Sequence, residues 1–287
     1  MKISTEIASA DRIVGLEKAV ELYAKAGFDA WDFSMFRMCR LDTTTWLPIK
    51  DENPLNGPHY LEFARRLKKI GLDNGIVCNQ SHAPFPVDSP AVRSFIERAI
   101  ECTAEAGGKI CVIHPDNHRS VEENAEFFRE LLPFAKSCGV KIAAENMWNW
   151  DKANDISLPA ACHSGENFKA HIDAVNDDSF IACLDLGHAE MRGSGDGAAH
   201  MIRTLGHRLQ ALHIHDNDLR HDCHQIPFSM DIDFVPIVKA LKEIGYSGYF
   251  TLEADAFLNG YTEENVLDGM IKLRESARKL AGMFESL

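Results

Sequence analysis

Residues 91–114 read AVRSFIERAIECTAEAGGKICVIH, and this stretch contains the unit from which the fold can be predicted. Its first part has the spacing of apolar residues typical of an amphipathic helix, and the glycine pair at 107–108 marks the end of that helix. The apolar run that follows, KICVIH at 109–114, is typical of a strand buried on both faces. The unit is therefore a helix, a glycine stop and a strand.

The same unit recurs along the chain. Further helical patterns that stop at glycine occupy 11–27, 59–71 and 121–139. Strand-like apolar runs cover 1–7, 28–34, 74–81, 109–114, 140–146, 179–186, 209–216 and 248–254. Eight βα units in 287 residues predict an α/β fold, a single (β/α)8 TIM barrel domain over residues 1–287. An open, doubly wound sheet is the alternative, but no GxGxxG motif follows the first strand.

Composition excludes several classes of protein. The chain has 30 Lys and Arg against 43 Asp and Glu, a net charge of −13, which argues against broad binding to nucleic-acid phosphates or anionic lipids. No apolar run approaches the roughly 18–20 residues of a membrane span. We therefore expect a cytoplasmic protein without a nucleic-acid or membrane partner. Apolar helical faces such as 266–284 are compatible with a homo-oligomer.

Polar side chains stand where six of the predicted strands end. They are Ser81 and His82, His114, Glu145 and Asn146, Asp185 with the nearby His188, His213 and His215, and Glu253. Each one alone is accounted for as a hydrogen-bonding cap of the following loop. In a barrel, however, all these strand ends meet at one rim, where uncompensated carboxylates would repel one another and be costly to desolvate. A bound cation removes that conflict.

Four of these residues form the predicted ligand set: Glu145, Asp185, His215 and Glu253. Three carboxylates and one imidazole suit one divalent ion of manganese, magnesium, cobalt or zinc. The ligand types do not choose among these metals.

Seven short motifs carry a resemblance to a known family. They are SHAPF (81–85), VIHPD (112–116), AAEN (143–146), LDLGH (184–188), HIHDND (213–218), DCHQIPF (222–228) and TLEAD (251–255). In this order and spacing the chain resembles the xylose isomerase-like barrels, which include ketose 3-epimerases, inosose dehydratases, hydroxypyruvate isomerases and endonuclease IV. In epimerase-type members, the resemblance implies that Glu145, Asp185, His215 and Glu253 hold one divalent metal.

The resemblance also implies a reaction. A metal-dependent isomerase or epimerase of a sugar or sugar phosphate would abstract an α-proton through a metal-bound enediolate, with Glu145 and Glu253 as the catalytic pair. Two opposed bases would invert a stereocentre, and one base working between adjacent carbons would isomerise an aldose and a ketose. An inosose-type dehydratase starts from the same proton abstraction, so the reaction subtype stays open.

The substrate implied is small and polyhydroxylated. His188, from the LDxxH motif, resembles a contact to a substrate hydroxyl, and we expect further contacts from His82, His114, His224, Arg220 and Trp148. Ketose 3-epimerases place an arginine shortly after the ligand histidine of the seventh strand; Arg220 lies near this position, but His221 falls closer to it.

Two long segments have two interpretations each. They are residues 31–54, with Trp31, Phe36 and Trp46, and residues 146–166, with Trp148 and Trp150. Each segment either covers or walls a sugar pocket, or packs on the end of the barrel.

Endonuclease IV is the alternative from a different class. The resemblance to its trinuclear zinc site is matched in residue type at His82, His114, Glu145, Asp185, His188, His215, Asp222, His224 and Glu253. The charge of −13 and the absence of Arg/Lys clusters with interleaved aromatics in the loops favour sugar chemistry. The segment 216–234 also resembles the sugar-handling members more than the endonuclease.

Overall fold

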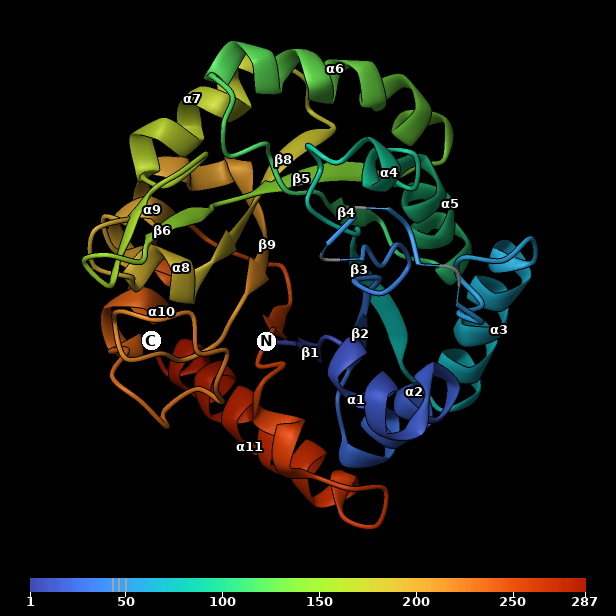
Figure 1. Ribbon diagram of the computed structural model, residues 1–287. Helices are drawn as coiled ribbons and strands as arrows, with labels where there is room; N and C mark the ends of the chain where they lie inside the picture. The colour runs from blue at the N-terminus through green and yellow to red at the C-terminus, as the bar shows by residue number, and fades with distance from the viewer. Residues whose placement is uncertain (43, 46, 50) are drawn as a thin grey trace.

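The computed structural model describes every residue except Thr43, Trp46 and Lys50, and its strands form a parallel barrel surrounded by helices (Figure 1). Six strands form one sheet in spatial order: β2 (Ala30–Ser34), β3 (Val77–His82), β4 (Ile110–Val112), β5 (Lys141–Glu145), β8 (Phe180–Asp185) and β9 (Leu209–His213). The strands β1 (Ile3–Thr5) and β10 (Phe250–Leu252) pair with each other in parallel.

Two single bridges close the ring. Glu6 pairs with Asp32 between β1 and β2, and Ile214 pairs with Leu252 between β9 and β10. All eight predicted strands are present in the predicted order, so the barrel prediction is confirmed.

The helices form the outer ring. They are α1 (Ala8–Val14), α2 (Leu16–Ala26), α3 (Tyr60–Asp73), α4 (Pro90–Arg93), α5 (Ile96–Ala106), α6 (Val121–Ser137), α7 (Gly165–Val175), α8 (Leu186–Glu190), α9 (Ala198–Leu205), α10 (Phe234–Glu243) and α11 (Val266–Glu285). Short 3₁₀ turns lie at Gly206–Arg208 and Phe257–Gly260. Among the described residues, no helix has both the length and the apolar character needed to cross a membrane.

Glycine lies at the helix end as predicted in three cases and not in a fourth. Gly27 and Gly107 adopt the left-handed conformation that ends α2 and α5, and Gly139, which also has a positive φ angle, directly follows the α6 cap residue Cys138. The stop predicted at Gly71 is wrong, because α3 continues to Asp73. A Cβ at Gly71 would lie 3.0 Å from the Trp31 indole nitrogen, so the missing side chain lets helix and strand approach closely. Trp31 is therefore a core residue and does not cover a pocket.

Buried apolar side chains fill part of the barrel interior. Val112, Ala143, Ile181, Cys183 and Ala211 form their own buried cluster, separate from the larger core between strands and helices. Because this cluster is apolar, the polar side chains converge at the carboxyl ends of the strands.

The hairpin that follows β5 was not predicted. An antiparallel hairpin, β6 (Trp148–Asp151) and β7 (Ile156–Pro159), lies between β5 and α7, within the segment expected to be an irregular loop. Trp46, another aromatic proposed to cover the pocket, lies outside the described residues.

Candidate metal centre

Two glutamates from separate strands meet near the barrel axis. Glu145 ends β5 and Glu253 directly follows β10, and both are buried. Together with Asp185 and His213 they offer four ligand atoms that all lie within 4.8 Å of one another. His213 Nδ1 is 2.9 Å from Glu145 Oε1 and 3.3 Å from Glu253 Oε2. The spacing is small enough for one cation to contact several of these atoms.

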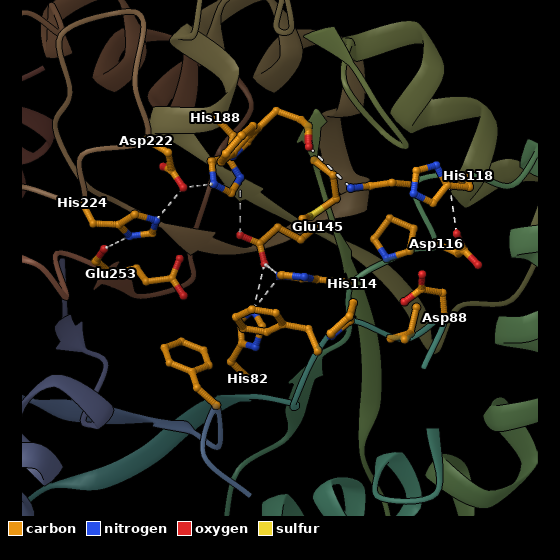
Figure 2. A pocket seen from close by; sticks show the side chains of 18 of the residues that line it. His82, Asp88, His114, Asp116, His118, Glu145, His188, Asp222, His224 and Glu253 are labelled. Carbon is orange, nitrogen blue, oxygen red and sulfur yellow. Dashed lines mark hydrogen bonds and ion pairs between the residues drawn. The ribbon is translucent and has the colours of Figure 1, made fainter. Parts of the chain in front are cut away.

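A second group of ligand atoms lies on the other oxygen of Glu145. His82 Nε2 and His114 Nε2 are only 2.9 Å apart, and they lie 3.2 and 3.3 Å from Glu145 Oε2 (Figure 2). Two imidazole nitrogens and a carboxylate oxygen thus converge on one point. This is the donor chemistry of a zinc, manganese or cobalt site.

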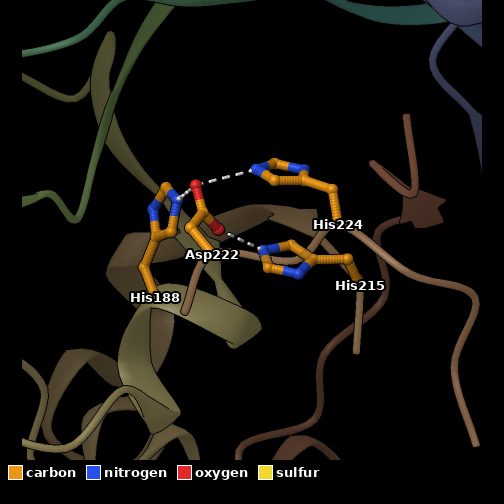
Figure 3. Close-up of side chains that lie close together, drawn as sticks. All are labelled: His188, His215, Asp222 and His224. Atoms are coloured by element: carbon orange, nitrogen blue, oxygen red, sulfur yellow. Dashed lines mark hydrogen bonds and ion pairs between the residues drawn. The ribbon is translucent and has the colours of Figure 1, made fainter. Parts of the chain in front are cut away.

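A third group surrounds Asp222, as Figure 3 shows. Asp222 Oδ2 lies 3.0 Å from His224 Nε2 and 3.4 Å from His188 Nε2, while Oδ1 lies 3.4 Å from His215 Nε2. The rings of His215 and His224 stack with centroids 4.1 Å apart. These four residues also have ligand atoms within 4.8 Å of one another.

Backbone carbonyls orient three of the imidazoles. The Nδ1 atom of His82 donates to the carbonyl oxygen of Ala83 at 2.7 Å, that of His188 to Asn146 at 2.9 Å, and that of His224 to Glu253 at 2.7 Å. A carbonyl oxygen only accepts, so Nδ1 carries the proton in each ring and Nε2 faces the carboxylates. Metal-ligating histidines are held in this way.

Three buried polar atoms in these groups make no hydrogen bond to a described residue, although His215 Nε2 lies within ion-pair distance of Asp185 Oδ1 (3.1 Å) and Asp222 Oδ1 (3.4 Å). They are Asp185 Oδ2, His215 Nε2 and Asp222 Oδ1. Leaving such atoms unsatisfied inside a protein is costly. Ligation of a divalent cation would satisfy them, so the donor set fits a metal.

Burial and neighbouring charges shift the pKa values of the ionisable side chains at the candidate centre. Burial acts to raise the pKa of Glu145, but neighbouring imidazoles, with His213 foremost, hold that pKa well below its ordinary value. Burial raises the pKa of Glu253 well above its ordinary value, and the charge of Glu145 adds to this effect. Burial acts to lower the pKa of His188, but nearby carboxylates, with Asp185 foremost, raise it to about 10. The raised pKa values favour the protonated forms of Glu253 and His188. A bound cation would neutralise the same negative charge in place of these protons.

Local sequence explains how these side chains are held. Asn146 bridges two strands, because its side chain accepts from the Asp185 amide at 2.7 Å and donates to the Asp185 carbonyl at 2.9 Å. Gly187 is the second residue of α8, and a Cβ there would lie 2.0 Å from His215 Cε1. The glycine of the LDLGH motif therefore provides the space that the His215 ring occupies.

The loop after β9 is organised by one buried aspartate. The carboxylate of Asp216 accepts hydrogen bonds from the backbone amides of Asn217, Met230 and Ile232. Within this loop, Leu219, His224 and Phe228 have positive φ angles. Such conformations cost free energy in residues with a side chain, and they occur often at functional sites.

A cavity of about 360 Å³ opens above the candidate metal centre. Its apolar wall consists of Phe36, Phe85, Pro86, Val87, Pro115, Met147 and Trp148. Its ionisable residues are Asp88, Asp116, Glu145, Asp222, Glu253 and Asp255 together with His82, His114, His118, His188 and His224 (Figure 2). No lysine or arginine is among the described residues that line it. The volume suits a small ligand.

Residues 20–276 match the xylose isomerase-like TIM barrel family. The chain belongs to this family. A relative, the uncharacterized protein MJ1311 of Methanocaldococcus jannaschii, is 25% identical over 276 residues, which cover 90% of this chain and 85% of the relative.

Two solved structures share the fold of this chain. A D-tagatose 3-epimerase-like protein superposes with a TM-score of 0.71 at 21% identity and covers 100% of this chain and 99% of its own. The IolI protein with a bound zinc atom gives a TM-score of 0.67 at 19% identity, with coverage of 100% and 99%.

Most residues predicted for the candidate site lie close together in the structure. Glu145, Glu253, His188, His82, His114, His224 and Trp148 line the cavity. Asp185 and His215 are fully buried beside it. The structure groups Glu145, Asp185 and Glu253 with His213, and it groups His215 with Asp222.

Arg220 lies apart from the cavity. Its guanidinium pairs with the carboxylate of Asp155 on the β6–β7 hairpin, and its Nε donates to the Asp155 carbonyl at 2.8 Å. A role in substrate binding would require Arg220 to leave this partner.

Sequence reasoning missed several residues that line the cavity. Phe85 lies in the SHAPF motif and Asp116 in VIHPD, so both follow predicted strands closely. Asp88 and His118 lie a few residues further on. Their short distance from the strand ends is the one feature of the sequence that points to them as cavity residues.

Proposed function

We propose that this protein is a divalent-metal-dependent isomerase or epimerase that acts on a ketose or a related hydroxy-ketone by α-proton abstraction. One observation carries the proposal: Glu145 and Glu253, from strands that are not neighbours, face one small cavity and share a group of potential ligand atoms. Glu145, Asp185, His215 and Glu253 would hold the cation. The zinc atom of the similar IolI structure supports a cation at such a centre.

When bound, the cation would act as a Lewis acid on the carbonyl of the substrate. Glu145 and Glu253 approach the cavity from different strands, so one carboxylate can remove a proton from carbon while the other returns one. His188, His82, His114 and other cavity imidazoles would contact hydroxyl groups. The apolar wall, with Phe36 and Trp148, would exclude water from the reacting carbon.

The lining also bears on the substrate class. Six carboxylates and no lysine or arginine line the described cavity, so an uncharged polyhydroxylated substrate fits it better than a phosphorylated one. The name of the D-tagatose 3-epimerase-like neighbour supports a ketose as the first compound to assay.

A second candidate function is phosphoester hydrolysis at a multinuclear zinc centre, as in endonuclease IV. The observation that favours it is the pair of additional ligand groups, one at His82 and His114 and one at His188, Asp222 and His224. Two observations argue against phosphoester hydrolysis: the net charge of −13, and the absence of lysine and arginine from the described cavity lining. Proteins bind phosphate backbones mainly through lysine and arginine.

Metal content per chain separates these two functions. Plasma mass spectrometry on protein purified without chelator should give one equivalent of manganese, magnesium, cobalt or zinc, followed by turnover of a member of a free-ketose panel. Two or three equivalents of zinc, with cleavage of abasic DNA and no sugar turnover, would contradict the proposal.

A further inference from the structure

His213 lies in the barrel interior with both ring nitrogens facing carboxylates. Its Nδ1 is 2.9 Å from Glu145 and 3.3 Å from Glu253, and its Nε2 is 3.5 Å from Asp32 Oδ2. His213 belongs to β9, whereas Asp32 and Glu145 belong to β2 and β5, and neither strand is a neighbour of β9. The imidazole therefore crosses the interior and connects three parts of the ring.

Asp32 has no other described partner that would explain its burial. The side chain is 1% exposed, and neither carboxylate oxygen accepts a hydrogen bond from a described residue. A buried carboxylate without a partner is strongly unfavourable. His213 is the imidazole within ion-pair distance, and Asp32 is not among the residues that line the cavity. We therefore expect Asp32 to act on the candidate centre through His213.

We infer that Asp32 and His213 form a positioning pair that holds Glu145 and Glu253 in the arrangement that accepts the cation. Asp32 fixes the ring so that Nδ1 faces the two glutamates, much as an outer carboxylate orients a metal-bound imidazole. The stack of His213 on His82, with centroids 5.4 Å apart and planes 21° from parallel, restrains the ring further. The inference rests on the proposed metal site, and only its activity measurement depends on the proposed reaction.

The test is a double-mutant cycle with His213→Gln, Asp32→Asn and the double variant. The matched controls are His207→Gln and Asp268→Asn, because both residues are exposed and outside the cavity. Cobalt(II) affinity is measured by calorimetry without substrate, and kcat and KM are then measured on the best ketose of the panel. Circular dichroism establishes that each variant is folded.

We expect His213→Gln to weaken cobalt affinity by about 10–100-fold, with kcat reduced more than KM is raised. Asp32→Asn should give a smaller loss in the same direction, and the double variant should be no worse than His213→Gln alone. The controls should match the natural protein. Asp32→Asn keeps the shape of the side chain, so it remains informative if His213→Gln does not fold.

Three results would overturn the inference. One is unchanged cobalt affinity in both single variants, and another is losses that simply add in the double variant. The third is the disappearance of a whole equivalent of cobalt in His213→Gln while His215→Gln retains it, because His213 would then be a ligand. If cobalt binds and the cycle behaves as expected but no sugar turns over, the proposed reaction fails and the positioning pair stands.

Discussion

Replacing Gly187 by alanine should disable the metal centre through one contact. The new Cβ would lie 2.0 Å from His215 Cε1 and 2.3 Å from Nε2, whereas real Cβ atoms stay at least 3.0 Å from their neighbours. The imidazole would have to retreat by about 1 Å. It packs against His224 and is fully buried, so there is little room for that movement.

The expected result is a loss of cation affinity of at least about 100-fold, because a displaced ligand costs more than the roughly 10–100-fold of a lost outer contact. Isothermal titration with cobalt(II) or zinc(II) measures this directly. Urea unfolding should also show a loss of about 1–3 kcal/mol from overpacking. The matched control is Gly282→Ala in α11, where a Cβ meets nothing within 4 Å. This control should bind the metal normally and be slightly more stable.

Full metal affinity in Gly187→Ala, with the control also normal, would refute the assignment of His215 as a ligand. Loss of affinity in both variants would show that the effect is not specific to this contact.

Three further predictions concern residues around the centre. His188→Ala should raise KM about tenfold and leave the metal content unchanged; loss of a metal equivalent by mass spectrometry would favour the multinuclear zinc centre instead. Burial, with a contribution from Asp255, raises the pKa of Glu6 from 4.5 to about 7, so the folded protein binds this proton more tightly than the unfolded chain. The free energy of unfolding should therefore fall by about 3 kcal/mol as the pH rises from 4.5 through 7, and Glu6→Gln should remove this part of the slope in urea unfolding of chelator-treated protein; an unchanged slope would contradict it. Asp216→Ala leaves three backbone amides without their acceptor and should cost about 3 kcal/mol or more in the same assay, whereas near-native stability would show that other groups hold the loop.

The polar side chains at the rim of the barrel could be predicted because their position depends on the local sequence of each strand. Each parallel strand ends at the carboxyl edge of the barrel. Once eight strands are recognised, Glu145, Asp185 and Glu253 are therefore expected to lie close together at that edge. The glycine stops at Gly27 and Gly107 are equally local, since each depends only on the helix that precedes it.

What could not be predicted depends on contacts between distant segments. Gly71 resembles a helix stop, but its role is set by Trp31, forty residues earlier in the chain. Arg220 lies near the position of a substrate-binding arginine, but the unpredicted β6–β7 hairpin places Asp155 beside it. In the sequence, Asp32 is one polar residue within an apolar strand. It lies close to His213 because the strands close into a barrel.

The exchange of a carbon-bound proton with solvent tests the central claim most directly. Free ketoses are incubated with the metal-loaded protein in deuterium oxide, and the recovered sugar is examined by proton NMR and mass spectrometry. We predict that one deuterium enters the carbon next to the carbonyl, that Glu145→Gln and Glu253→Gln each reduce the rate at least about 1,000-fold, and that His207→Gln does not. Normal exchange in either glutamine variant, or turnover without deuterium in the product, would contradict proton abstraction by the two glutamates.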